Sequence, residues 1–381
     1  MPGVHAFADR LVLRTANAAE NVLVHQNWGA SVLLGAVKVS FAMVANAVYQ
    51  RNCSVAPDAS PYDVCDQSDL PWSKSLGDRL VHVSIPAVFE FQTLVDLVVF
   101  FALVLCAKLM LWLRLTLRQG FGDAMGNLKS FSLDEYLVSS DNNAVAISLS
   151  GYILALAMTL TGVLDCPDAN VGFHGLWVIT FTALGMLLLL CAQQINARVM
   201  LRTIQNSQAM LDNNIAVACL EAGSFVACGR IMQAVLSGSS DTVEEAFATI
   251  LLFWSTSQVI LLLFTLVYRV VTSFDDEAAM KDGNVAVGLS SGLTLVAAAF
   301  AITGPIFTFA SYPLFIIVSF VSLALLVLLR VIVDRTILPG DSLDGEMMQC
   351  NWGAALIEGA AALSIALVMG VFQHAPEDAV C

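Results

Sequence analysis

The chain has 381 residues, of which 58% are hydrophobic and 13% charged, with a mean hydropathy of +0.77 and a formal net charge of −14. A soluble protein of this length needs more polar groups to cover its surface, so the composition indicates a polytopic membrane protein. The dispersed negative charge argues against binding to nucleic acid and against a basic patch for anionic lipids.

The chain begins with a segment, residues 1–27, that we expect to lie at the membrane interface. A first transmembrane helix is predicted at 28–49, followed by a loop at 50–85. Cys53 and Cys65 enclose a Pro-containing turn in this loop, and an oxidising compartment would close them into a disulfide.

Further apolar stretches follow, each close to the length of about 20 residues that a membrane-spanning helix needs. None alternates in the manner of a barrel strand, so an all-α membrane bundle of about nine transmembrane helices is expected. After the first helix, the spans are predicted at 86–113, 143–164, 174–196, 214–236, 246–268, 284–304, 308–333 and 352–372, with a tail at 373–381.

Five of these stretches share a sequence marker: an asparagine with small residues two and four positions later. The copies are NWGASVLLG from Asn27, NNAVAISLSG from Asn142, NIAVACLEAG from Asn214, NVAVGLSSG from Asn284 and NWGAALIEG from Asn351. The asparagine suits the N-cap of a helix, and the small residues suit close helix packing in lipid. We therefore expect these marked helices at the centre of the bundle and the Leu-rich helices at its rim.

The marked helices also alternate between a serine and a glutamate, in the order Ser150, Glu221, Ser291 and Glu358. The spacing is 141 residues from Asn143 to Asn284 and 137 from Asn214 to Asn351, which predicts one duplication of a larger unit. The adjacent Asn142 and Asn143 leave the register of the first copy ambiguous by one residue.

Glu221 and Glu358 are the main candidates for a buried polar or ion site. Each lies seven residues after its asparagine, about 10 Å into the helix, where a carboxylate must be protonated, paired or hydrated. Lys38 could supply a cation, whereas Arg230 lies too far round its own helix to pair with Glu221. Ser150, Ser291 and Asp96 are further candidates for the same polar interior. A role only in packing is the equally weighted alternative.

Basic residues are distributed unequally between the two ends of the predicted helices. Eleven lie on the side of the asparagine markers and three on the other side. The positive-inside rule then predicts a cytoplasmic amino terminus and a non-cytoplasmic carboxyl terminus.

Catalytic and cofactor motifs are absent from the sequence. It contains no phosphate-binding loop, dinucleotide fingerprint, nucleophile elbow or zinc-binding spacing. We therefore expect no catalytic residues, no metal, no cofactor and no enzymatic activity.

The repeats resemble an uncharacterised family of membrane proteins, domain of unknown function number 350. The resemblance rests on an Asp-Asn or Gly-Asn followed by an Ala-rich helix with a central glycine, as in 141–151, 212–223 and 282–292. The copy at 351–359 departs from it at Trp352. The resemblance implies two tandem four-helix copies, at 86–236 and 246–372, and it implies no activity.

Two functions remain open from the sequence. The first is a conduit or transporter for protons, cations or a small solute, because ionisable residues at equivalent repeat positions are typical of transport sites. The second is a non-catalytic structural or accessory subunit of a membrane complex. The expected partners are the lipid bilayer and, in either case, further copies or other membrane subunits.

Overall fold

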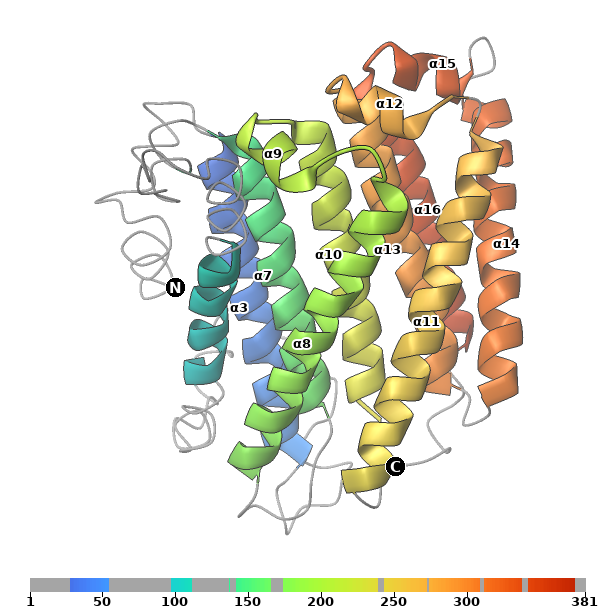
Figure 1. Ribbon diagram of the computed structural model, residues 1–381. Helices are drawn as coiled ribbons and strands as arrows, with labels where there is room; N and C mark the ends of the chain where they lie inside the picture. The colour runs from blue at the N-terminus through green and yellow to red at the C-terminus, as the bar shows by residue number, and fades with distance from the viewer. Residues whose placement is uncertain are drawn as a thin grey trace, which may run out of the picture.

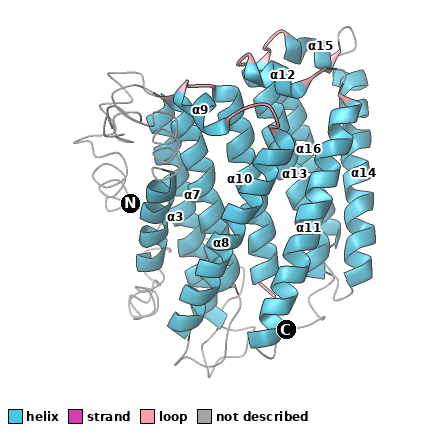
Figure 2. Cartoon of the chain, viewed as in Figure 1, coloured by secondary structure: helices cyan, strands magenta, loops and turns pink. Residues whose placement is uncertain are grey.

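The computed structural model describes residues 28–54, 97–111, 137, 142–165, 174–238, 243–272, 274–308, 312–337 and 342–373. These residues form helices joined by short loops (Figure 2), as the apolar stretches of the sequence predicted. Seven helices in the described ranges are long and apolar enough to cross a membrane, and two shorter apolar helices cover 31–47 and 97–111.

The marked helices form a row through the bundle (Figure 1). They are α3 (Trp28–Ser54), α7 (Asn143–Leu164), α10 (Ile215–Leu236), α13 (Val285–Thr308) and α16 (Trp352–Gln373). Each packs mainly on the next, since the four most extensive helix contacts are those between successive members of the row. All five begin at the same end of the bundle, which we call the cap end.

The long helices return the chain to the cap end and cover the row. They are α8 (His174–Met200), α11 (Val243–Val271) and α14 (Tyr312–Ile337), with the helix at 97–111. In succession, α8 contacts α7 and α10, α11 contacts α10 and α13, and α14 contacts α13 and α16.

Burial confirms the central position of the three marked helices inside the row. In the most apolar stretch of α7, 83% of the residues are buried, against 33% in α11 and in α14. The marked helices at the two ends of the row are less buried: α16 is 33% buried, and α3 exposes Val32 and Val39. The row is built from small residues: a Cβ atom added to Gly288 of α13 would lie 2.1 Å from the Ala216 carbonyl oxygen of α10.

Three short helices at the cap end had no counterpart in the predicted elements. They are α9 (Asn206–Leu211), α12 (Asp276–Lys281) and α15 (Leu343–Met348), and each leads into a marked helix. A residue with positive φ separates the two, namely Asn213, Gly283 or Cys350. This left-handed turn reverses the chain in two or three residues, and glycine and asparagine adopt it most readily.

The asparagine markers are helix N-caps, as predicted, and they also join neighbouring units. Asn142, Asn214 and Asn284 each accept hydrogen bonds from the first turn of their own helix. The side-chain amide of each donates to a carbonyl at the end of the following short helix: Met210 in α9, Met280 in α12 and Met347 in α15. One residue type thereby fixes both the start of a helix and its neighbour.

Candidate functional site

The most charged interior site surrounds Glu358 in α16. Its carboxylate lies 2.8 Å from Nε of Arg330 in α14 and accepts a 2.5 Å hydrogen bond from the Tyr268 hydroxyl of α11. Ser290 of α13 donates to the second carboxylate oxygen. With only 3% of Glu358 and 8% of Arg330 exposed, this ion pair is buried among four helices.

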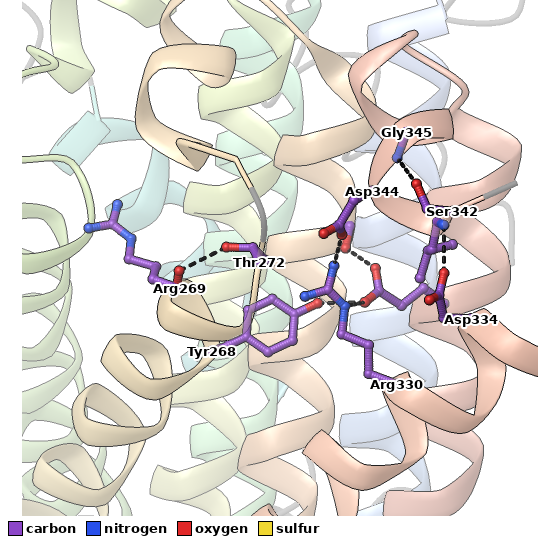
Figure 3. Close-up of polar contacts among 11 residues, drawn as sticks. Tyr268, Arg269, Thr272, Arg330, Asp334, Ser342, Asp344 and Gly345 are labelled. Carbon is purple, nitrogen blue, oxygen red and sulfur yellow. Dashed lines mark hydrogen bonds and ion pairs between the residues drawn. The ribbon is translucent and has the colours of Figure 1, made fainter.

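Arg330 connects Glu358 to the cap end of the bundle. Its guanidinium carbon lies 4.8 Å from the centre of the Tyr268 ring, a cation–π contact, and its Nη2 also pairs with Asp344 of α15. Figure 3 shows Arg330 between Tyr268 and Asp344, with Asp334 and Ser342 beyond them. Asp334 accepts from the Leu343 amide and so helps to position α15. A short helix outside the membrane-spanning part therefore supplies one partner of the buried arginine.

Asp276, the first residue of α12, lies near the same network. It is 7% exposed, and one of its carboxylate oxygens has no hydrogen-bond partner within the described ranges. Burial raises the pKa of Asp276 to about 6, although the nearby Arg269 and Arg330 oppose the shift and Asp344 reinforces it. The side chain is therefore a candidate for proton exchange near neutral pH.

A small cavity of about 30 Å³ lies between Asp276 and Tyr268. Ser291 and Thr294 of α13 also line it, together with apolar residues such as Met200, Leu220 and Phe264. Such a cavity is large enough for one or two water molecules, which need several polar partners. Asp276 and Tyr268, the partner of Glu358, thus line one cavity.

Glu221 of α10 occupies a less charged site. It is 3% exposed and accepts a 3.2 Å hydrogen bond from the side-chain amide of Gln193 in α8. Asn196 donates to Ser224 and Cys228 one and two turns farther along α10. A second, smaller cavity is lined by Glu221, Gln193 and Asn196 and reaches Asn206 at the start of α9.

The two glutamate sites are equivalent positions of the repeat. Glu221 and Glu358 are 137 residues apart, and so are Gln193 and Arg330. In both copies the partner precedes the glutamate by 28 residues and approaches it from the preceding long helix. The same position is therefore a neutral amide in one copy and a cation in the other.

The whole-chain comparison agrees with this repeat. The model of one family, described as Domain of Unknown Function (DUF350), matches residues 89–236 and again residues 242–372. The chain belongs to the DUF350 family. The two matches confirm the tandem copies expected from the sequence. No curated protein and no solved structure matches the chain.

The structure fixes the register between the two DUF350 copies. Asn142 caps α7 and Asn284 caps α13, so these two correspond, and the spacing of 141 from Asn143 is wrong by one residue. Ser148 is then the equivalent of Ser290, and Ser150 does not correspond to Ser291. Two adjacent asparagines made this register ambiguous in the sequence. In the structure Asn143 is the first helical residue of α7, and its side chain accepts a hydrogen bond from the Gly29 amide of α3.

The remaining predicted site residues are dispersed. Ser150 bonds to the Ala146 carbonyl within α7, and Ser291 lines the cavity beside Tyr268. Arg230 bonds to Gln233 and lies 4.7 Å from the Phe300 ring centre. Lys38 is half-buried on α3, which α7, α10 and α13 separate from α16. The cation beside Glu358 is thus Arg330, and neither Lys38 nor Arg230.

Several expectations lie outside the described residues. These are Asp96, Asn27, Cys65 with its expected bond to Cys53, the interfacial segment 1–27, most of the loop 50–85 and the tail after Gln373. Within the described ranges, no group of three or more His, Cys, Asp or Glu side chains could hold a metal ion.

The raised pKa of Asp276 predicts a pH-dependent stability. The folded state holds this proton more tightly than the unfolded chain, whose Asp pKa is 3.8, so stability should fall as pH rises from about 4 to 6 and level off above. The loss should be on the order of 2–3 kcal/mol. Asp276→Asn should remove this slope in chemical unfolding between pH 4 and 8. Asp282→Asn, at an exposed position just after α12, should keep it, and an unchanged slope in Asp276→Asn would contradict the assignment.

Proposed function

We propose that this DUF350 protein is a non-enzymatic conduit that moves protons through the membrane by way of the Glu358 network. The single observation that carries the proposal is the water-sized cavity that Asp276 and Tyr268 both line, beside the buried Glu358–Arg330 pair. A carboxylate near the cap end and a tyrosine bonded to a buried carboxylate are groups of the kind that proton relays use.

The size of the cavity favours protons over larger solutes. About 30 Å³ holds one or two waters and excludes an organic substrate. Proton transfer also needs no open pore, because a hydroxyl such as that of Tyr268 can donate one proton and accept another.

Polar groups continue beyond Glu358 into the half of the bundle away from the cap end. Ser257 of α11 and Ser319 of α14 are fully buried, each with a hydroxyl oxygen that has no hydrogen-bond partner in the described ranges. They precede Tyr268 and Arg330 by eleven residues, about 16 Å along their helices. They could continue a proton path only with water between them and the Glu358 network.

Tyr268→Phe tests the conduit most directly, because it removes the hydroxyl between cavity and carboxylate but keeps the Arg330–Glu358 pair. In proteoliposomes with an internal pH dye, we expect proton flux to fall at least about tenfold, while the free energy of unfolding changes by about 1 kcal/mol. The matched control is Tyr152→Phe, since the buried Tyr152 hydroxyl has no hydrogen-bond partner in the described ranges. This control should leave flux unchanged. A folded Tyr268→Phe protein with full flux would contradict the proposal.

The alternative, a structural or accessory subunit, is favoured by a different observation. Both carboxylate oxygens of Glu358 are hydrogen-bonded and Arg330 has two acidic partners. In this role the ion pair would serve only to fix the packing of α14 against α16. Wild-type protein that carries no proton flux in the same liposomes would favour this second role.

A further inference from the structure

The two ends of the helix row differ from its interior. Each of α7, α10 and α13 has a marked helix on both sides, whereas within the described part of the chain α3 contacts only α7 and α16 only α13 among the marked helices. The outer face of α16 exposes Leu356 and Leu367, and that of α3 exposes Val32 and Val39. The row therefore ends on two apolar faces.

Within the chain, successive marked helices meet through one constant register. The ninth residue after the cap of one helix contacts the eighth residue after the cap of the next. Gly151 and Gly223 are ninth residues: a Cβ added to either would lie 2.5 Å from the eighth residue of the next helix, Ala222 or Gly292. In the third pair the glycine is the eighth residue, and a Cβ added to Gly359 would lie 2.3 Å from Leu293, the ninth residue of α13. The interface between α7 and α10 is thus repeated between α10 and α13 and between α13 and α16.

The same register identifies the residues that would continue the row. The ninth residue after Asn351 is Ala360, which is exposed on α16. The eighth residue after Asn27 is Gly35, and a Cβ added there meets no atom of the described residues within 4 Å. Both faces therefore present a small residue at the position that the internal interfaces use for closest approach.

The cap asparagines provide an independent indication. Asn142, Asn214 and Asn284 each donate to the end of the short helix that precedes the next marked helix. Asn351, at the end of the row, is exposed, and its amide donates instead to Glu346 of its own connecting segment. The side-chain amide of Asn351, at the start of α16, is therefore the same group that joins neighbouring units elsewhere in the row.

The geometry points to head-to-tail self-association, in which α16 of one copy docks on α3 of a second copy through the interface that joins neighbouring marked helices within the chain. Such a contact is heterologous, with different surfaces on its two sides, so it builds a closed ring or an extended row of copies. The inference concerns assembly and does not depend on proton conduction.

Cysteine cross-linking in liposomes tests this contact. Full-length Gly35→Cys and Ala360→Cys proteins are reconstituted together and oxidised, and the linked peptides are identified by mass spectrometry against the unsubstituted protein. A peptide linking residues 35 and 360 must then join two copies, and we expect it to dominate. Links only between two copies of residue 35 or of residue 360, or no link beyond those of the native cysteines, would overturn the head-to-tail arrangement.

Bulky substitutions give a second readout. Gly35→Trp has open space around it in one copy, so the chain should fold, but the side chain should block docking and raise the dissociation constant at least about tenfold. The constant is measured by dilution of labelled protein into increasing amounts of lipid. Val321→Trp, on the exposed face of α14, is the matched control and should associate as the wild type does. Equal association of all three proteins, or a monomeric wild type, would contradict the inference.

Discussion

Replacing Arg330 with methionine is expected to lower the free energy of unfolding by about 3–5 kcal/mol, because Glu358 would remain buried without its cation. Asp344 contributes less to the loss because its side chain is 20% exposed and water can reach it. Chemical unfolding in detergent micelles measures the loss.

The chain supplies its own control for this experiment. Gln193→Met changes the equivalent position of the first DUF350 copy, where the contact with Glu221 is a hydrogen bond from a neutral amide. It should cost about 1–2 kcal/mol. The double variant Arg330→Met with Glu358→Met should recover most of the stability, since an apolar pair of similar size can replace a buried ion pair. Equal losses at Arg330 and Gln193 would show that charge is not what distinguishes the two sites.

Gly288→Ala is expected to destabilise the row of marked helices by about 3 kcal/mol, the upper part of the usual range for overpacking. The added methyl group would lie 2.1 Å from the Ala216 carbonyl oxygen, and backbone atoms cannot move aside as a flexible side chain can. The helices α10 and α13 would have to separate along their length. Thermal unfolding in detergent, followed by circular dichroism, reports this change.

Gly370→Ala in α16 is the matched control for Gly288→Ala. No atom of the described residues lies within 4 Å of a Cβ added at Gly370. Alanine is the better helix former by up to about 1 kcal/mol, so this variant should be neutral or slightly more stable. A Gly288→Ala protein as stable as Gly370→Ala would mean that α10 and α13 do not approach as closely as described.

The helices, the repeat and the central row could be predicted because each leaves a direct signal in the sequence. Apolar length defines the spans, and the spacing of small residues after an asparagine defines the helices that pack closely. Asn142, Asn214 and Asn284 are caps as expected. The adjoining Asp212 and Asp282 are the C-caps of the short helices α9 and α12.

The partners of Glu358 were harder to predict because they come from three other helices. Arg330 lies near the end of a Leu-rich span, where basic residues normally reach the interface. One available signal was the shared spacing of 28 residues between Gln193 and Glu221 and between Arg330 and Glu358. Ser290 was missed because the doubled Asn142 and Asn143 shifted the alignment to Ser291.

Because the marked helices pack in a single row, the stability of this row depends mainly on contacts between successive helices. Each marked helix packs most extensively on its neighbours in the row, so stability within the row is close to a sum of nearest-neighbour terms, as in solenoid proteins. A defect in α13 therefore weakens two interfaces of the row, whereas one in α16 weakens only its interface with α13. Unfolding can then proceed by fraying from the α16 end, and a further unit could be added there without disturbing the helices already in place.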